Sequence, residues 1–157
     1  METQVKNLFD PALVDDTQTR ILLLTAENQP SWGTLNVSQA LVHCALGFEM
    51  ATGALKTKRA PFPATLFGRV IKPFIFRDNK PMRRNSPSAP ELFTGNTAGY
   101  HFINERSRLL EEMHRFAARG PAGCTHQPHP FFGPLTPEEW AILMYKHIDH
   151  HLRQFGA

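Results

Sequence analysis

Residues 136–154, TPEEWAILMYKHIDHHLRQ, decide the fold of this 157-residue chain. They open with a helix start: Thr136 can cap a helix, Pro137 suits the first helical position, and Glu139 can complete a capping box. At about 100° per residue, the stretch places its large apolar side chains and two histidines on one face. These residues are Trp140, Leu143, Met144, His147, Ile148 and His151. The stretch therefore predicts an amphipathic helix that turns two imidazoles toward the core.

Proline marks where long helices can form, because it lacks the amide hydrogen and clashes with the preceding turn. The 13 prolines leave four long stretches without proline, residues 12–29, 31–60, 91–120 and 138–157. No segment alternates apolar and polar residues for long enough to predict a sheet. We therefore expect one all-α domain over residues 1–157, most simply a four-helix bundle.

Capping signals predict three further helix boundaries. Asp10 before Pro11 indicates the start of the first helix, and Asn36 indicates the start of the second. Gly120, followed by a proline, indicates the end of the third. The second helix is apolar almost all round, so we expect it to lie at the centre of the fold. Its apolar residues are Val37, Ala40, Leu41, Val42, Cys44, Ala45, Leu46, Phe48 and Met50.

Composition narrows the function classes. Hydrophobic residues make up 41% of the chain, enough for a core, and a net charge of +3 requires neither a nucleic acid nor a membrane as partner. No apolar run approaches the ~20 residues of a membrane span, and the acidic N-terminus is unlike a secretory signal. The two cysteines lack the spacing of a disulfide framework or a cysteine-type zinc site. We expect a cytoplasmic protein with no nucleic-acid or membrane partner.

The connection between the second and third helices is rich in proline and strongly basic. Residues 55–84 contain nine lysines and arginines against one acid, Asp78. Five apolar residues recur there at helical spacing and predict a short amphipathic helix that Pro73 disturbs. They are Leu66, Phe67, Val70, Ile71 and Phe74. Because they are too many for a solvated loop, we expect them to be buried against the bundle or against a second subunit.

The histidines are the most informative residues. His147 and His151 are four positions apart on one helical face, so both rings can reach one ion at about 2.0–2.1 Å. The alternative is that they are packed imidazoles, hydrogen-bonded to backbone or water. The central second helix supplies a third imidazole, His43, on a line with Gln39 and Gly47, and Gly47 leaves open space beside it. The three histidines together predict a metal site.

Residues 147–154, HIDHHLRQ, together with the lone His43, resemble the DinB/YfiT-like superfamily of metal-binding four-helix bundles. Residues 32–43, WGTLNVSQALVH, extend the resemblance over nearly the whole chain. Residues 129–140, HPFFGPLTPEEW, resemble an uncharacterised branch of that superfamily.

This resemblance implies an up-down-down-up bundle with a long crossover between helices two and three, and a homodimer. It also implies that His43, His147 and His151 bind a divalent metal, for which we expect zinc or nickel. Four more residues are assigned to the surroundings of the metal, namely His150, Gln154, Gln39 and His129. His150 is offset from the inner face, and Gln154 can bond a ligand imidazole or cap the helix. Gln39 lies one turn before His43, and His129 lies in a loop where packing is the favoured role.

Three imidazoles leave coordination positions open to substrate, as in catalytic metal sites. Ile148 stands where a metalloprotease needs its glutamate, which disfavours peptide hydrolysis. The resemblance implies a transferase that uses a low-molecular-weight thiol, since a bound metal ionises a thiol at neutral pH. We therefore expect a metal-dependent S-transferase acting on a small-molecule substrate. The alternatives are a metal-dependent hydrolase and a bundle that binds a metal or ligand without catalysis.

Overall fold

The structure is a computed structural model that describes residues 4–93 and 99–157. Over these residues the chain is helical and contains no strand, which confirms the all-α prediction. In chain order, the five α-helices are α1 (Pro11–Leu23), α2 (Val37–Thr52), α3 (Ala64–Phe76), α4 (Phe102–Arg119) and α5 (Pro137–Gln154). Two short 3₁₀ turns, η1 (Pro90–Leu92) and η2 (Pro121–Gly123), flank α4.

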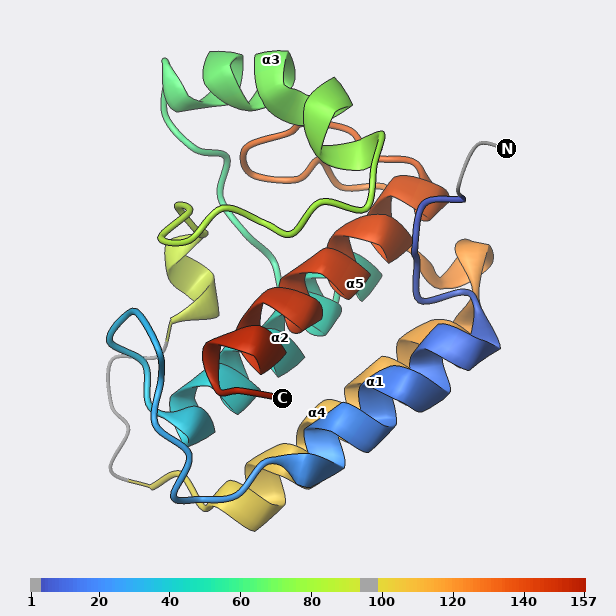
Figure 1. Cartoon of the computed structure of the whole chain (residues 1–157). Coiled ribbons are helices and arrows are strands. Elements are labelled where there is room, and N and C mark those ends of the chain that lie inside the picture. Colours follow the sequence, from blue (N-terminus) through green and yellow to red (C-terminus); the bar gives the residue numbers. More distant parts are fainter. Residues whose placement is uncertain (1–3, 94–98) are drawn as a thin grey trace.

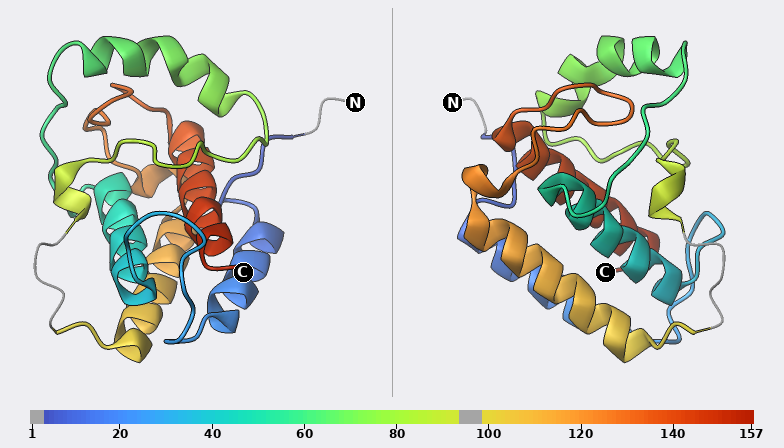
Figure 2. Two further views of the ribbon diagram at one scale, coloured as in Figure 1. Left: turned by 60° about the vertical axis from the view of Figure 1, so that its left-hand side comes forward. Right: turned by 180° about the vertical axis from the view of Figure 1, so that it is seen from behind.

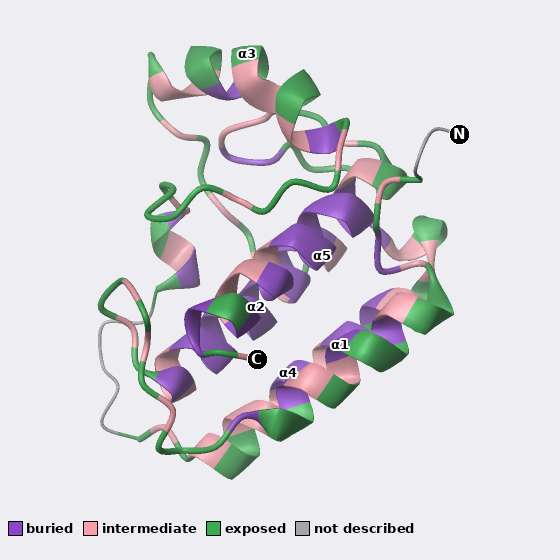
Figure 3. Cartoon of the chain, in the orientation of Figure 1, coloured by how far each residue is buried: buried purple, intermediate pink, exposed green. Residues whose placement is uncertain are grey.

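Helices α1, α2, α4 and α5 pack against one another (Figure 1). Helix α2 contacts both α4 and α5, and α1 contacts the same two helices from the other side. Helix α2 is buried along almost its whole length, as its composition predicts (Figure 3). On α5, Trp140, Met144 and Ile148 reach the core, as the periodicity predicts. The two histidine-bearing helices therefore lie beside each other.

The capping signals mark the helix starts correctly. The Asp10 carboxylate accepts from the amide of Ala12 at 2.9 Å. Asn36 and Gln39 form a reciprocal capping box at the start of α2, and Thr136 forms another at the start of α5. Gly120 follows the last residue of α4, with a φ of 61° that suits glycine. These boundaries depend on contacts within one turn, which is why the sequence alone predicts them.

Helix α3 lies away from the other helices, above one end of α5 (Figures 1 and 2). It continues through Pro73 to Phe76, so the expectation that Pro73 disturbs the helix is wrong. Pro73 lies on the exposed side of α3, where water can replace the missing donor. The five apolar residues are expected to be buried against the bundle or against a second subunit, and the bundle covers only Ile71, which is partly buried. The exposed four are Leu66, Phe67, Val70 and Phe74.

The segment after α3 returns across α5 and is fixed to it by a buried lysine. Lys146 donates to the carbonyl of Lys80 at 3.1 Å and lies 3.7 Å from the Asp78 carboxylate. The connection then reaches η1, which packs against α2. No helix of the described part of the chain is both long and apolar enough to cross a bilayer.

Candidate metal centre

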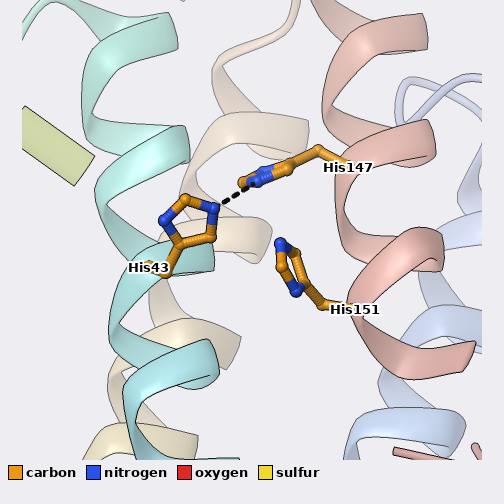
Figure 4. A group of neighbouring side chains, drawn as sticks. All are labelled: His43, His147 and His151. Atoms are coloured by element: carbon orange, nitrogen blue, oxygen red, sulfur yellow. Dashed lines mark hydrogen bonds between the residues drawn. The ribbon is translucent and has the colours of Figure 1, made fainter. Parts of the chain in front are cut away.

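His43 on α2 faces His147 and His151 on α5 (Figure 4). One ring nitrogen from each histidine lies within 4.8 Å of those of the other two. The Nε2 atoms of His43 and His147 are 2.9 Å apart. Two nitrogens bound to one tetrahedral ion at about 2.0–2.1 Å would lie roughly 3.3 Å apart. To hold an ion, the His43–His147 pair would open slightly, and nitrogens near the 4.8 Å limit would have to move closer. The three residues predicted as ligands thus come together.

His43 is fixed by the short turn η1. Its Nδ1 lies 3.0 Å from the carbonyl oxygen of Leu92. A carbonyl oxygen only accepts, so Nδ1 carries the proton and Nε2 presents its lone pair to the α5 histidines. The ring of Phe93 stacks on the His43 ring with centroids 4.8 Å apart, which gives the site an apolar wall.

His151 is oriented by the end of its own helix. Its Nδ1 lies 2.8 Å from Oε1 of Gln154, and Nε2 of Gln154 donates to the carbonyl of Trp32 at 2.7 Å. The amide oxygen only accepts, so the Nε2 of His151 also presents a lone pair. Gly33 makes this contact possible, because a Cβ there would lie 2.8 Å from the Gln154 nitrogen. The loop before α2 therefore orients a ligand on α5.

His147 occupies the space that Gly47 leaves. A Cβ on Gly47 would lie 3.0 Å from Nδ1 of His147, so the gap expected beside His43 is filled by this second imidazole. Since His43 Nε2 is an acceptor, the Nε2 of His147 donates to it when no ion is bound. Binding through this nitrogen therefore displaces its proton, whereas His43 and His151 are already in the ligating tautomer.

All three imidazoles are held neutral. Burial lowers the pKa of His43, and burial together with the neighbouring imidazoles holds the pKa of His147 well below its usual range. Burial lowers the pKa of His151 to about 3, although its hydrogen bond with Gln154 opposes the shift. Metals bind the neutral imidazole, so the donor set fits a divalent ion at physiological pH.

His150 lies beside the site without joining the group of three. Its ring packs edge-on against His151 at 5.0 Å and against Trp32 at 5.6 Å. The Arg84 guanidinium lies over the Trp32 indole, 4.2 Å from the ring centroid. Burial is the main cause that lowers the pKa of His150, and the charge of Arg84 lowers it further. Arg84, a cation of the basic connection, is therefore separated from His150 by the Trp32 ring.

Two residues assigned to the surroundings of the metal make hydrogen bonds to backbone amides of their own segments. The side chain of Gln39 caps α2 by accepting from the amide of Asn36 at 2.7 Å. Buried His129 accepts at Nδ1 from the amides of Phe131 and Phe132, at 3.1 and 3.2 Å. Its role in the structure is loop packing, the one favoured for it from the sequence.

Acid should destabilise the metal-free protein through His129. Burial lowers the pKa of His129 to about 4, whereas the unfolded chain takes up this proton near pH 6.5. The unfolded state therefore binds more protons between these values, so the free energy of unfolding falls as pH falls from 6.5 toward 4. Urea titrations at several pH values measure this. As pH falls from 6.5 toward 4, the free energy of unfolding of the wild type should fall by up to about 1.4 kcal/mol per pH unit more than that of His129→Asn. The asparagine amide oxygen can still accept from the amides of Phe131 and Phe132. An equal pH dependence of the free energy of unfolding in the two proteins would contradict the role of His129.

The structure adds partners that sequence reasoning missed: the carbonyls of Leu92 and Trp32, the ring of Phe93, and Gly33. A backbone carbonyl has no residue-type signature, so no sequence signal could identify the first two. Gly33 and Trp32 lie within the stretch that resembles the superfamily, but that likeness does not indicate their contacts.

A family model described as "Protein of unknown function (DUF1569)" matches residues 4–157. No curated protein and no solved structure matches the chain.

Proposed function

The chain belongs to the DUF1569 family, a family of unknown function, and on that premise we propose that it is a divalent-metal-dependent enzyme. The observation that carries the proposal is the group of three neutral imidazoles, His43, His147 and His151, with donor atoms within 4.8 Å of one another. Three protein ligands leave positions for substrate, which is typical of catalytic rather than structural sites. Imidazole donors suit zinc and nickel.

A low-molecular-weight-thiol S-transferase is the activity that the site supports best. The chain's own thiols are poor nucleophiles, because burial strongly raises the pKa of Cys44 and raises that of Cys124 to about 11. A thiol nucleophile would therefore come from a small molecule. A divalent ion, when bound, supplies the Lewis acidity that ionises such a thiol at neutral pH.

The chain's own residues have distinct roles in this proposal. His43, His147 and His151 hold the ion, and the Phe93 ring shields one face of His43. Arg84, whose guanidinium packs on Trp32 beside His150, attracts a carboxylate of the thiol or of its electrophilic partner.

Hydrolysis is the alternative activity, and non-catalytic binding of a metal or ligand is the alternative function. The residue after His147 is Ile148, which is buried in the core and is no general base. This disfavours peptide hydrolysis of the metalloprotease type. Hydrolysis by a metal-bound hydroxide needs no carboxylate base, so it stays the alternative that the activity test must separate from the transferase.

We also propose that the chain belongs to a branch of the DinB/YfiT-like superfamily. The packing of α1, α2, α4 and α5 against one another supports this proposal, as does the distribution of the histidines over α2 and α5. The long connection that contains α3 would then be the crossover of an up-down-down-up bundle.

Metal-reconstituted protein should accelerate the conjugation of glutathione, bacillithiol-like or mycothiol-like thiols to an aryl halide. His43→Ala should abolish the acceleration for every thiol. Arg84→Glu should raise KM about tenfold for a carboxylate-bearing thiol and little for a neutral one, which corresponds to about 1.4 kcal/mol. Arg119→Glu, the same charge change at the exposed end of α4, is the matched control. Rates equal to those of metal-free protein for all thiols would exclude the transferase and leave hydrolysis or binding.

A further inference from the structure

Helix α3 is apolar on both of its long faces. Ile71 and Ile75 are half-buried and Phe76 is buried, whereas a second set of large apolar residues is exposed. Figure 3 shows exposed positions along α3 between buried and intermediate ones. This outer face consists of Leu66 (52% exposed), Phe67 (64%), Val70 (61%) and Phe74 (55%), with Phe62 (77%) just before the helix. Large apolar side chains gathered on one exposed helix face are typical of a contact surface. The outer face of α3 therefore lacks a partner within the described chain.

The inner face of α3 is held firmly, so the helix cannot rotate to bury the outer one. A Cβ on Gly68 would lie 2.1 Å from the carbonyl oxygen of Phe131, which shows how closely the two backbones approach. Phe76 packs edge-on against Phe132 at 5.6 Å. Lys72 donates to the carbonyl of Pro134 at 2.7 Å and pairs with a carboxylate of α5 at 3.0 Å. The outer face is thus presented on a fixed support.

We propose that the outer face of α3 is the contact surface for a second copy of this chain, a role independent of the metal site. A large apolar side chain can bury about 150–250 Å², and the five side chains are between 52% and 77% exposed, so together they offer roughly 550 Å² per copy. Two copies would bury about 1,100 Å² from these side chains alone, near the lower limit of about 1,200 Å² for stable interfaces. The prolines and arginines around the face add to this area.

The outer face is also complementary to itself. Val70, the smallest of its residues, lies at the middle of α3, with Leu66 and Phe74 four positions away on either side. In an antiparallel pair related by a two-fold axis near Val70, each Leu66 lies opposite the Phe74 of the other copy. Such a pairing is closed, because the same surface serves both partners. The small side chain at the axis lets the two helices approach.

Charge distinguishes a second copy from a lipid surface as the occupant. Helices that lie on membranes turn a free, strongly charged face to water, whereas the opposite face of α3 packs on the protein and Lys72 is already paired. Two copies bring two basic connections together, each with nine cations and one acid over residues 55–84. Self-association should therefore strengthen with added salt, whereas attraction to anionic lipid should weaken.

Sedimentation velocity on the untagged full chain should show a species of twice 17.8 kDa between about 1 and 100 μM, and its dissociation constant should fall as NaCl rises from about 0.1 to 1 M. Val70→Glu, which places two carboxylates at the axis, should leave a monomer throughout this range. Leu23→Glu is the matched control, since Leu23 is 68% exposed on α1, and should dimerise like wild type. Unchanged helical circular dichroism should show that both variants fold.

Oxidation of Val70→Cys should give a disulfide-linked dimer, because residues at a two-fold axis meet their own copies, whereas Leu23→Cys should not. Three results would overturn the proposal: a wild-type monomer throughout, a dimer that Val70→Glu leaves intact, or a dimer that both variants disrupt. A monomer that co-sediments with vesicles of three parts phosphatidylcholine to one part phosphatidylserine, and loses this through Val70→Glu, would assign the face to lipid instead.

Discussion

Zinc-reconstituted protein should hold about one ion per chain, and His151→Ala should lose that ion whereas His150→Ala should keep it. The Nε2 of His151 presents a free lone pair toward His43, because its Nδ1 is held by Gln154. The His150 ring instead packs against Trp32 and takes no part in the group of three. Removing a ligand should weaken affinity by more than about 100-fold, beyond the 10–100-fold typical of residues that only support a ligand.

The two variants form a close control for each other, since they delete the same side chain from adjacent positions of α5. Metal affinity should be measured by competition with a chromophoric chelator, and the fold by thermal unfolding of the metal-free protein. Equal loss of metal in both variants would contradict the assignment of His151 as the ligand. Wild-type protein that takes up no ion after reconstitution would contradict the metal site itself.

The sequence predicts those parts of the molecule that depend on local chemistry. The capping box at Thr136 and the glycine after α4 act within one turn, so the residues themselves indicate where helices begin and end. The pairing of His147 with His151 follows from helical spacing alone. The approach of His43 is less local, but a polar residue on an otherwise apolar central helix needs a partner, and α5 supplies one.

Distant contacts made by backbone carbonyls could not be predicted. Leu92 lies 49 residues from the His43 ring that it orients, and only its carbonyl takes part. Helix α3 shows a second limit. Periodicity indicates that Val70 and Phe74 need burial, but it does not say whether the covering surface belongs to the same chain. The pattern predicts that Pro73 disturbs α3, yet one missing donor on the exposed side does not end the helix.

The contact between Gly33 and Gln154 should set the affinity of the metal site from outside it. Gln154→Ala should weaken metal binding 10–100-fold, because His151 would lose the partner that fixes its tautomer and ring orientation. Gln154→Glu should recover only part of the affinity, since a carboxylate also accepts from Nδ1 of His151 but cannot donate to the carbonyl of Trp32. Gly33→Ala should reproduce the loss, because its Cβ would lie 2.8 Å from the Gln154 amide nitrogen and push that side chain away.

Gly156→Ala is the control that separates displacement of the Gln154 side chain in Gly33→Ala from backbone strain. Gly33 and Gly156 have similar positive φ angles, 78° and 81°, so alanine strains the backbone at both positions. A Cβ at Gly156 would have open space around it, whereas one at Gly33 would collide with Gln154. Both variants should therefore lose similar stability in the metal-free form, but only Gly33→Ala should lose metal affinity. Equal affinities in chelator competition would show that the loop before α2 does not orient His151, and the ring would then be held by α5 alone.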